Sequence, residues 1–369
     1  MEYRRAHAAR PGIGRTFVPF LLLLTLFFGA PVHSFGQEYR DVLPGYRVKL
    51  PADIHFKEDY RVQWWYFTGH LFTGEGREFG YEITFFAVNV QKKKYESRFG
   101  LNTLFISHFA LSDIEGQEYY YRESMDGGAF GFSGAKRDRL SVWVGDDLLE
   151  GSMEKLRLKA AGEGRAVDLT LVPEKPYVLN GDAGFSRKSS DDPLLASIYI
   201  SNTDLETVGT VKIGDRSIGV RGKSWFDREI SSRGQLGNLK GWDWFAIQLD
   251  DGREIMLYRL RKADGAIDDF STGTLVNRDG TYRILKKDEF FLRPLGHYRS
   301  KKTGARYPSA WTVRVPGEKV DLTVTPLIQD QEFVAPFSTG NYYWEGACRV
   351  EGSATGRAYV ELTGYPGDQ

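Results

Sequence analysis

The sequence predicts an all-β protein made of antiparallel strands, and three observations support this. The 369 residues include 24 Phe, 20 Tyr and 8 Trp, which suit half-buried strand faces, and 41 Gly, which suit turns between short strands. Aromatic and β-branched runs at 81–86, 167–171 and 197–200 are separated from one another by glycine-containing turn sequences. We recognise no amphipathic helix longer than about three turns, and no alternation of strands with helices, which argues against a nucleotide-binding parallel sheet.

Internal similarity predicts that the chain contains two related β domains. One matching pair of strands can arise by chance in any β protein, but three pairs in the same order indicate a duplication. The matched pairs are 64–67 with 242–245, 167–173 with 320–326, and 209–213 with 346–350. We therefore expect one domain over residues 40–234 and a second over residues 235–369.

Residues 1–36 have the features of a secretory signal peptide. Four arginines precede an apolar run, and small residues follow it before Gln37. The alternative is an uncleaved membrane anchor, but the run is shorter than the roughly 20 residues of a spanning helix. We therefore expect export, and no integral membrane span once the signal is cleaved. No cysteine follows the run, so we expect an exported protein, periplasmic or extracellular, without a lipid anchor.

The charge balance excludes one class of partner. The chain has 49 basic and 49 acidic residues, so it lacks the surplus of Lys and Arg that sequence-blind nucleic-acid binding requires. Without residues 1–36, which hold four arginines and one glutamate, 45 basic and 48 acidic residues remain. The single cysteine, Cys348, cannot form a disulfide within the chain.

Metal and cofactor signatures are absent from the sequence. The histidines beyond the signal segment fall in no H-x-H or H-E-x-x-H pattern, and there is no cysteine pair. The segment 131–135 lacks the spacing of a serine-hydrolase elbow, and no phosphate-binding loop is present. We expect neither a metal nor a cofactor.

One cluster of residues suggests chemistry. Trp225, Asp227 and Glu229 alternate along a predicted strand and therefore share one face. In an aromatic pocket, such a carboxylic acid would have a raised pKa and could donate a proton. The alternative is a hydrogen-bonded corner of Asp, Arg and Glu that joins the two domains. Trp242 and Trp244 also share a face, opposite Asp243.

Two further polar residues lie on predicted strands. His108 is next to an apolar face, where a buried core histidine and a catalytic histidine are both possible interpretations. Glu82 either points into a cavity or pairs with an arginine. The sequence leaves both alternatives open for each residue.

Long motifs resemble the lipocalin-like AttH family, whose members are often labelled carotenoid 1,2-hydratase or predicted secreted hydrolase. The resemblance runs from about residue 50 to Tyr365, and its motifs include VQWWYFTGHL, FGYEITFF, SHFALSD, SWFDRE, GWDWFAIQLDDGREIMLYRLR and GRAYVELTGY. It implies two tandem lipocalin-like, calycin-type antiparallel β-barrels, which can enclose an apolar ligand. Carotenoid hydratases of the family add water to an isoprenoid double bond, and other relatives catalyse pericyclic cyclisations. The secreted branch implies a lipid-related envelope role beside a transporter permease.

The sequence departs from the family motif at two positions. Where the family usually has D-H-E-W or D-H-E-F, this chain has Asp227-Arg228-Glu229-Ile230. Arg228 cannot donate a proton near neutral pH, although its forked guanidinium group suits an anionic head group. Ile230 has no aromatic ring to stabilise a carbocation. Tyr258 keeps the position of a family tyrosine, but the acidic residue that usually follows it is missing. These departures argue against carotenoid hydration.

Three hypotheses remain: a binding protein for a hydrophobic or lipid-like molecule, an acid-catalysing enzyme with a hydrophobic substrate, and a structural envelope protein with filled barrels. The predicted catalytic residues are Asp227, Glu229 and Tyr258. The predicted ligand pocket comprises Trp64, Trp65, Glu82, His108, Trp225, Arg228, Trp242, Asp243 and Trp244.

Overall fold

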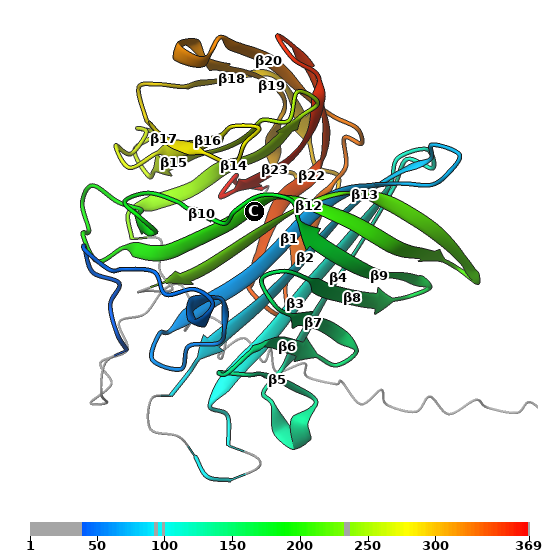
Figure 1. The fold of residues 1–369 in the computed structure, drawn as a ribbon, viewed down its shortest axis with the longest axis vertical. Coiled ribbons are helices and arrows are strands. Elements are labelled where there is room, and N and C mark those ends of the chain that lie inside the picture. Colours follow the sequence, from blue (N-terminus) through cyan, green and yellow to red (C-terminus); the bar gives the residue numbers. More distant parts are fainter. Residues whose placement is uncertain (1–38, 92–94, 98–99, 232–236, 368–369) are drawn as a thin grey trace, which may run out of the picture.

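The chain folds as two antiparallel β-sheets that pack against each other (Figure 1). The structure, a computed structural model, describes residues 39–91, 95–97, 100–231 and 237–367. Within these residues the helices are three single 3₁₀ turns, η1 (Ala52–Ile54), η2 (Ala129–Gly131) and η3 (Pro316–Glu318). No helix in the described ranges is long and apolar enough to cross a membrane. The predicted signal segment lies outside these ranges, so its cleavage and the export of the protein remain predictions.

The first sheet has thirteen strands and curls into a nearly closed barrel, because β6 packs against β2, β3 and β4. Its strand order is β4-β3-β2-β1-β13-β12-β9-β8-β7-β6-β5, with β10 and β11 also paired to β12. The strands are β1 (Val62–Phe72), β2 (Glu78–Asn89), β3 (Thr103–Asp113), β4 (Glu118–Asp126), β5 (Ser133–Ala135), β6 (Leu140–Val144), β7 (Asp147–Gly151), β8 (Leu156–Gly162), β9 (Arg165–Pro173), β10 (Val178–Leu179), β11 (Phe185–Arg187), β12 (Ala196–Ile213) and β13 (Arg216–Ser231).

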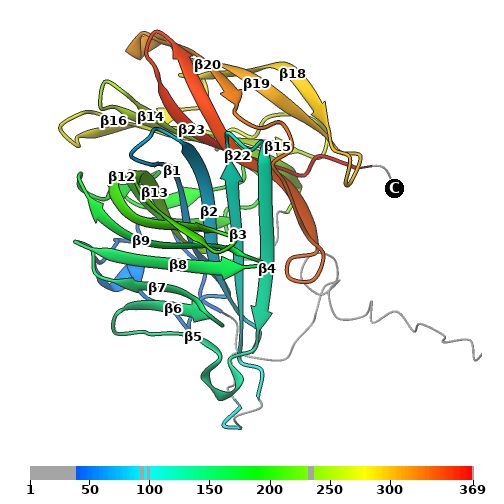
Figure 2. The ribbon, with the colours of Figure 1, turned by 90° about the vertical axis from the view of Figure 1, so that its right-hand side faces the viewer.

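The second sheet has ten strands and forms a half-barrel that lies across one side of the first (Figure 2). Its order is β17-β16-β15-β14-β23-β22-β20-β19-β18, with β21 paired to β22. The strands are β14 (Leu239–Leu249), β15 (Glu254–Lys262), β16 (Thr272–Val276), β17 (Tyr282–Lys286), β18 (Phe291–Arg299), β19 (Arg306–Val315), β20 (Val320–Pro326), β21 (Glu332–Ala335), β22 (Asn341–Gly352) and β23 (Gly356–Thr363).

The predicted duplication is present in the topology. The central order β2-β1-β13-β12-β9-β8 of the first sheet corresponds to β15-β14-β23-β22-β20-β19 of the second. The three sequence matches fall on β1 and β14, on β9 and β20, and on β12 and β22, so each pair occupies the same place in its sheet. The prediction of two tandem antiparallel barrels is therefore confirmed, with the second barrel only half closed.

Alternation of side chains assigns each strand two roles. On β1, Trp65 and Phe67 are buried in the core of the first barrel, whereas Tyr66 belongs to a third cluster between the sheets. On β14, Phe245 lies in the core of the second barrel and Trp244 in the same third cluster. The two barrels thus share a buried interdomain layer, which positions the functional site.

Glycine permits close contact between the sheets. A Cβ added to Gly80 on β2 would lie 2.7 Å from Cβ of Ala347 on β22 and 3.0 Å from Oη of Tyr359. Only a residue without a side chain fits there, because carbon atoms normally stay well over 3 Å apart. Gly252, in the turn that joins β14 to β15, has a φ of +82°, which glycine adopts without strain.

Candidate functional site

The interdomain layer is lined by aromatic side chains from both sheets. The ring of Trp244 on β14 meets the rings of Tyr66 on β1 and Trp225 on β13 edge-on, with centroids 5.2 and 6.2 Å apart. Trp225, Asp227 and Glu229 do share one face of β13, as predicted. That face points toward the second sheet, away from the core of the first barrel.

Asp227 is buried and fully hydrogen-bonded in this layer. Its Oδ2 accepts a bond from Tyr199 at 2.7 Å, and its Oδ1 accepts bonds from Ser201 and from Nε1 of Trp225, the latter at 2.8 Å. Burial raises the pKa of Asp227 to about 7, although these three donors oppose the shift. Trp244 continues the network by donating to Tyr199 at 3.1 Å. Asp227 thus organises a network within the first sheet that reaches the second sheet through Tyr199 and Trp244, and its catalytic role remains a prediction.

Glu229 forms a buried ion pair that the sequence analysis did not identify. Nζ of Lys188 lies 2.6 Å from Oε1 of Glu229, which also accepts a hydrogen bond from Ser197 at 3.2 Å. The same ammonium group lies 4.6 Å from the ring centroid of Tyr199 and 4.5 Å from that of Tyr258. Burial is the largest influence and acts to lower the pKa of Lys188, but Glu229, Tyr258 and Asp227 together outweigh it and the net shift is upward.

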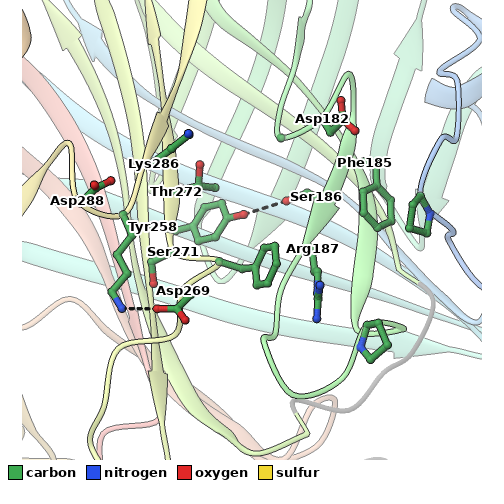
Figure 3. A pocket seen from close by; sticks show the side chains of 15 residues that line it. Asp182, Phe185, Ser186, Arg187, Tyr258, Asp269, Ser271, Thr272, Lys286 and Asp288 are labelled. Atoms are coloured by element: carbon green, nitrogen blue, oxygen red, sulfur yellow. Dashed lines mark hydrogen bonds and ion pairs between the residues drawn. The ribbon is translucent and has the colours of Figure 1, made fainter.

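Tyr258, on β15, connects this ion pair to an open pocket. Its hydroxyl lies 2.9 Å from Oγ of Ser186 on β11, so the contact joins the two sheets (Figure 3). Burial raises the pKa of Tyr258, while Lys188 and the Ser186 hydrogen bond act to lower it. The phenol therefore holds its proton at neutral pH, and a positive charge beside the ring would stabilise the phenolate if the proton left.

The pocket has a volume of about 780 Å³ and lies between β11 and the strands β15 to β17. Its size is within the usual range of ligand sites, roughly 300–1,000 Å³. Prolines and phenylalanines form the walls, and charged side chains of both signs surround them (Figure 3). The lining residues are Pro44, Gly181, Asp182, Phe185, Ser186, Arg187, Pro193, Tyr258, Asp269, Phe270, Ser271, Thr272, Lys286, Lys287 and Asp288.

A second group of carboxyls occupies the same layer. Glu345 on β22 and Glu361 on β23 are directly opposed in the strand register, and Glu345 accepts a hydrogen bond from Tyr66. Glu82 on β2 is fully buried and accepts a bond from Thr84, while its Oε2 has no hydrogen-bond partner among the described residues. Burial raises the pKa of Glu82 and of Glu345 well above the ordinary range. The interdomain layer therefore holds protons on several carboxyl groups.

These protons predict an unusual pH dependence of stability. Burial raises the pKa of Glu361 from its ordinary 4.5 to about 7. Between pH 4.5 and pH 7, Glu361 holds a proton in the folded state that it releases in the unfolded state. This bound proton stabilises the fold fully below pH 4.5, and its contribution is lost as the pH rises toward 7. Because glutamine does not titrate, Tm of Glu361→Gln relative to wild type is expected to increase across this window and to level off above pH 7.

Thermal unfolding followed by circular dichroism at closely spaced pH values measures this difference. The matched control is Glu351→Gln on the exposed end of β22, where the side chain is 57% exposed. Its Tm profile should run parallel to that of wild type. Parallel profiles for both variants would show that Glu361 does not hold a proton in the fold.

The structure does not bring three predicted pocket residues to this layer. Trp65 and Arg228 point to the opposite face of their strands, since side chains alternate. The guanidinium group of Arg228 stacks on Trp65 at 4.0 Å and donates to the carbonyl of His55 and to Oε1 of Gln63. Arg228 is therefore directed away from Asp227 and Glu229. It is not placed to bind the anionic group of a ligand that lies beside those two residues.

Asp243 likewise faces the interior of the second barrel. Its Oδ2 lies 2.6 Å from a guanidinium nitrogen of Arg259, and its Oδ1 accepts a hydrogen bond from Tyr365 at 2.7 Å. Arg261 approaches the same carboxylate at 3.3 Å. This closed network gives Asp243 a structural role.

His108 and the two remaining tryptophans lie along the edge of the layer. The imidazole nitrogens of His108 contact Oη of Tyr343 at 2.8 Å and Oγ of Ser338 at 2.9 Å, and burial lowers its pKa to about 3. These contacts favour the interpretation as a buried, neutral core histidine. Trp64 and Trp242 are half-buried on the faces of β1 and β14 that line the layer.

The sequence analysis missed Lys188, Ser186, Glu345 and Glu361. Ser186 and Lys188 lie in the stretch GFSRK, which carries no recognisable catalytic spacing. Glu345 directly follows Trp344, and Glu361 lies two positions after Tyr359 on the neighbouring strand; this proximity to aromatic residues was the one available signal. Their proximity arises from pairing between segments far apart in the chain. Within the described residues, no group of three or more His, Cys, Asp and Glu is arranged to hold a metal ion.

Comparison with known proteins identifies relatives of the whole chain. A family model described as AttH-like matches residues 41–365. A crystal structure assigned to AttH from Nitrosomonas europaea is 32% identical, covers 88% of this chain and 99% of that chain, and has a TM-score of 0.81.

Two more distant relatives carry enzyme names. Kievitone hydratase from Nectria haematococca shares the fold, with a TM-score of 0.65 and 14% identity over 89% of this chain and 96% of that chain. The dehydratase AsqC of Emericella nidulans is 20% identical over 233 residues, which are 60% of this chain and 64% of that protein, so the match spans less than two thirds of the relative. The match over residues 41–365 and the similarity to the Nitrosomonas protein confirm the resemblance seen in the sequence, and the chain belongs to the AttH-like family.

Proposed function

We propose that this protein is an acid–base enzyme of the hydratase or dehydratase class, and that it acts on a largely apolar substrate bound in the pocket between the barrels. The observation that carries the proposal is the position of Tyr258. Tyr258 is among the residues that line a pocket of about 780 Å³, its hydroxyl contacts Ser186, and its ring is backed by the ion pair of Lys188 with Glu229. The hydratase and dehydratase names of two relatives agree with this class of reaction.

Tyr258 can perform both proton transfers of a hydration. Its hydroxyl donates a proton to one carbon of a double bond, and the oxygen of a water molecule bonds to the other carbon. The water then returns a proton to the phenolate, which restores the enzyme, and dehydration is the reverse sequence. Lys188 stabilises the phenolate between the two transfers, because its ammonium lies 4.5 Å from the ring centroid.

The pocket walls indicate the substrate class. Phe185 and Phe270 provide apolar surface, and the guanidinium group of Arg187 stacks on Phe270 at 4.1 Å. Lys286 and Asp288 belong to the charged part of the lining (Figure 3). An amphipathic or lipid-like molecule with an apolar body and a polar end fits this lining. Together with the predicted export signal, it suggests a role in the cell envelope.

An isotope experiment tests the proposal. The purified protein is incubated in ¹⁸O-labelled water with a panel of unsaturated and hydroxylated apolar compounds, including acyclic terpenes and their alcohols. We expect mass spectrometry to detect either a hydrated product with the label in its newly formed hydroxyl group, or a dehydrated product that has lost the mass of one water molecule. Tyr258→Phe should give no detectable product. The matched control for this variant is Tyr282→Phe, because the Tyr282 hydroxyl accepts a hydrogen bond from the amide of Leu179 and lies outside the pocket lining.

Native mass spectrometry of the same samples separates catalysis from binding. A retained ligand without any product would mean that the protein binds a ligand in this pocket but does not catalyse a reaction. The apolar walls of the pocket also suit that function. Neither product nor retained ligand across the panel would contradict both functions.

A further inference from the structure

Three carboxyl groups lie between the two sheets without a positive charge beside them. They belong to Glu82 on β2, Glu345 on β22 and Glu361 on β23, and we call them the carboxyl cluster. Glu82 and Glu345 are 0% and 3% exposed, and Glu361 is half-buried. Among the described residues, no lysine or arginine acts on the pKa of any of the three. Buried acidic groups are usually paired with a cation, so the cluster lacks the partner that such groups normally have.

The packing of the sheets directs these carboxyls toward one another. The strands β2 and β22 lie beside each other, and Gly80 meets Ala347 there (Figure 2). Glu82 lies two positions after Gly80 and therefore points into the same layer. Glu345 lies two positions before Ala347 and does the same from the other sheet. Glu361 is directly opposite Glu345 in the strand register, which places their Cβ atoms roughly 4.5–5.5 Å apart.

Two buried oxygen atoms at the cluster have no hydrogen-bond partner among the described residues. They are Oε2 of Glu82 and Oη of Tyr119 on β4. Glu82 and Glu345 both act to raise the pKa of Tyr119, after the larger effect of burial, so the phenol lies near the cluster. An unpaired buried oxygen is costly, and a proton on Glu82 would only exchange an unpaired acceptor for an unpaired donor. A group with several N–H donors would satisfy both oxygens.

Aromatic side chains border the cluster on both sheets. Phe86 shares the face of Glu82 on β2, and its ring centroid lies 6.5 Å from that of Trp64. Tyr343 shares the face of Glu345 on β22, and Trp242 lines the layer from β14. All four rings are half-buried although they face the opposite sheet, so solvent reaches this part of the layer. Aromatic faces attract ammonium ions as carboxylates do.

The other titratable groups around the cluster carry no positive charge. Tyr66 on β1 donates to Glu345, and burial holds its pKa well above the ordinary value. Asp227 and Glu229 on β13 act to raise the pKa of Glu361. His108 on β3 is neutral, because burial lowers its pKa to about 3.

Two lysines approach the layer, but each already has an acidic partner. Lys302, whose Nζ lies 5.6 Å from the ring centroid of Tyr119, pairs with Asp330 at 2.8 Å. Lys188 pairs with Glu229 at 2.6 Å. A cation that enters the layer is therefore not repelled by an unpaired lysine.

We propose that the carboxyl cluster binds the primary ammonium group of an organic amine, with the apolar body of the amine against Trp64 and Trp242. An ammonium group has three N–H donors and a positive charge, whereas a hydroxyl group has one donor and no charge. A metal ion is less suitable, because no three His, Cys, Asp or Glu side chains of the described residues are arranged to hold one. When the ammonium group binds, at least one carboxyl ionises and releases its proton to solvent. This site is separate from the reaction proposed at Tyr258, and either can fail without the other.

Isothermal titration calorimetry of the full chain near neutral pH tests the proposal. The probe is hexylammonium chloride, and hexan-1-ol is the neutral molecule with the same chain. We expect hexylammonium to bind, and hexan-1-ol to bind more weakly by a factor of about ten or more. The apparent enthalpy for hexylammonium should differ between phosphate and Tris buffers, because each buffer takes up the released proton with a different heat.

Two variants locate the binding site. Glu82→Gln and Glu345→Gln should each weaken hexylammonium binding by about tenfold to a hundredfold, since each removes a charged acceptor. Both should keep the circular dichroism spectrum of wild type, because an amide has nearly the shape of the protonated carboxyl that it replaces. The matched control is Glu351→Gln on the same strand as Glu345, where the side chain is 57% exposed, and it should bind like wild type.

Several results would overturn the proposal. Wild type without affinity for hexylammonium, or with equal affinity for hexan-1-ol, would mean that the cluster does not recognise a cation. An enthalpy that is the same in both buffers would mean that no carboxyl ionises on binding. Unchanged affinity in both cluster variants, or an equal loss in Glu351→Gln, would place the bound amine elsewhere on the protein.

Discussion

Replacing Tyr258 with phenylalanine is expected to lower turnover by about 10²–10⁴-fold, the usual contribution of a general acid–base group. The substitution removes only the hydroxyl that contacts Ser186 and keeps the ring beside Lys188. Ligand binding by the apolar walls should therefore persist, so the loss should appear in kcat and much less in KM. Steady-state kinetics on the substrate identified by isotope labelling measures both parameters.

Stability measurements distinguish this catalytic loss from a structural one. One lost hydrogen bond is worth about 1 kcal/mol, so Tyr258→Phe should unfold only slightly earlier than wild type in urea. Tyr282→Phe removes a comparable hydroxyl outside the pocket and should keep full activity. If both variants retain wild-type kcat, Tyr258 is not the proton donor.

Replacing Lys188 with methionine is expected to reduce the free energy of unfolding by about 3–5 kcal/mol, because it leaves Glu229 buried without its ion-pair partner. The side chains of Lys188 and Glu229 are only 18% and 7% exposed, so little water is available to replace the lost contact. Lys188→Met combined with Glu229→Gln removes both charges and should recover a large part of the loss. Urea denaturation of the two single variants and the double variant gives the coupling energy.

The comparison pair for this experiment is Arg314 with Asp321, which lie 3.1 Å apart and are 57% and 59% exposed. Arg314→Met should cost no more than about 1 kcal/mol, because solvent screens an exposed pair. Similar losses at the buried and the exposed pair would mean that water reaches Glu229 in the interdomain layer.

The repeated architecture could be predicted from the sequence with good detail. Turn chemistry and aromatic runs indicated antiparallel strands, and the matches at 64–67 and 242–245 fall on β1 and β14, which hold corresponding places in the two sheets. These features are local, because a turn or an alternating strand depends on residues that are neighbours in the chain. The sequence did not show how far each sheet closes. The second sheet, predicted to be a barrel, is only half closed.

The candidate site was predicted only in part. Alternation correctly placed Trp225, Asp227 and Glu229 on one face, but the predicted pocket also included Arg228, which lies on the opposite face of the strand. The sequence could not tell whether that face lines a barrel or meets the other sheet. The partners of these residues are long-range, since Lys188 and Tyr258 are 70 positions apart and approach each other only because the barrels are packed together.

The sequence by itself therefore determined the antiparallel strands, the duplication and the faces on which the polar residues lie, because strand geometry repeats every two residues. Tertiary structure decided which faces meet. It placed Asp227 in a closed hydrogen-bond network, gave Glu229 its partner Lys188, and brought Tyr258 to the lining of a pocket. The physical reason is that burial and pairing set the protonation of these groups, and both depend on how the two sheets pack.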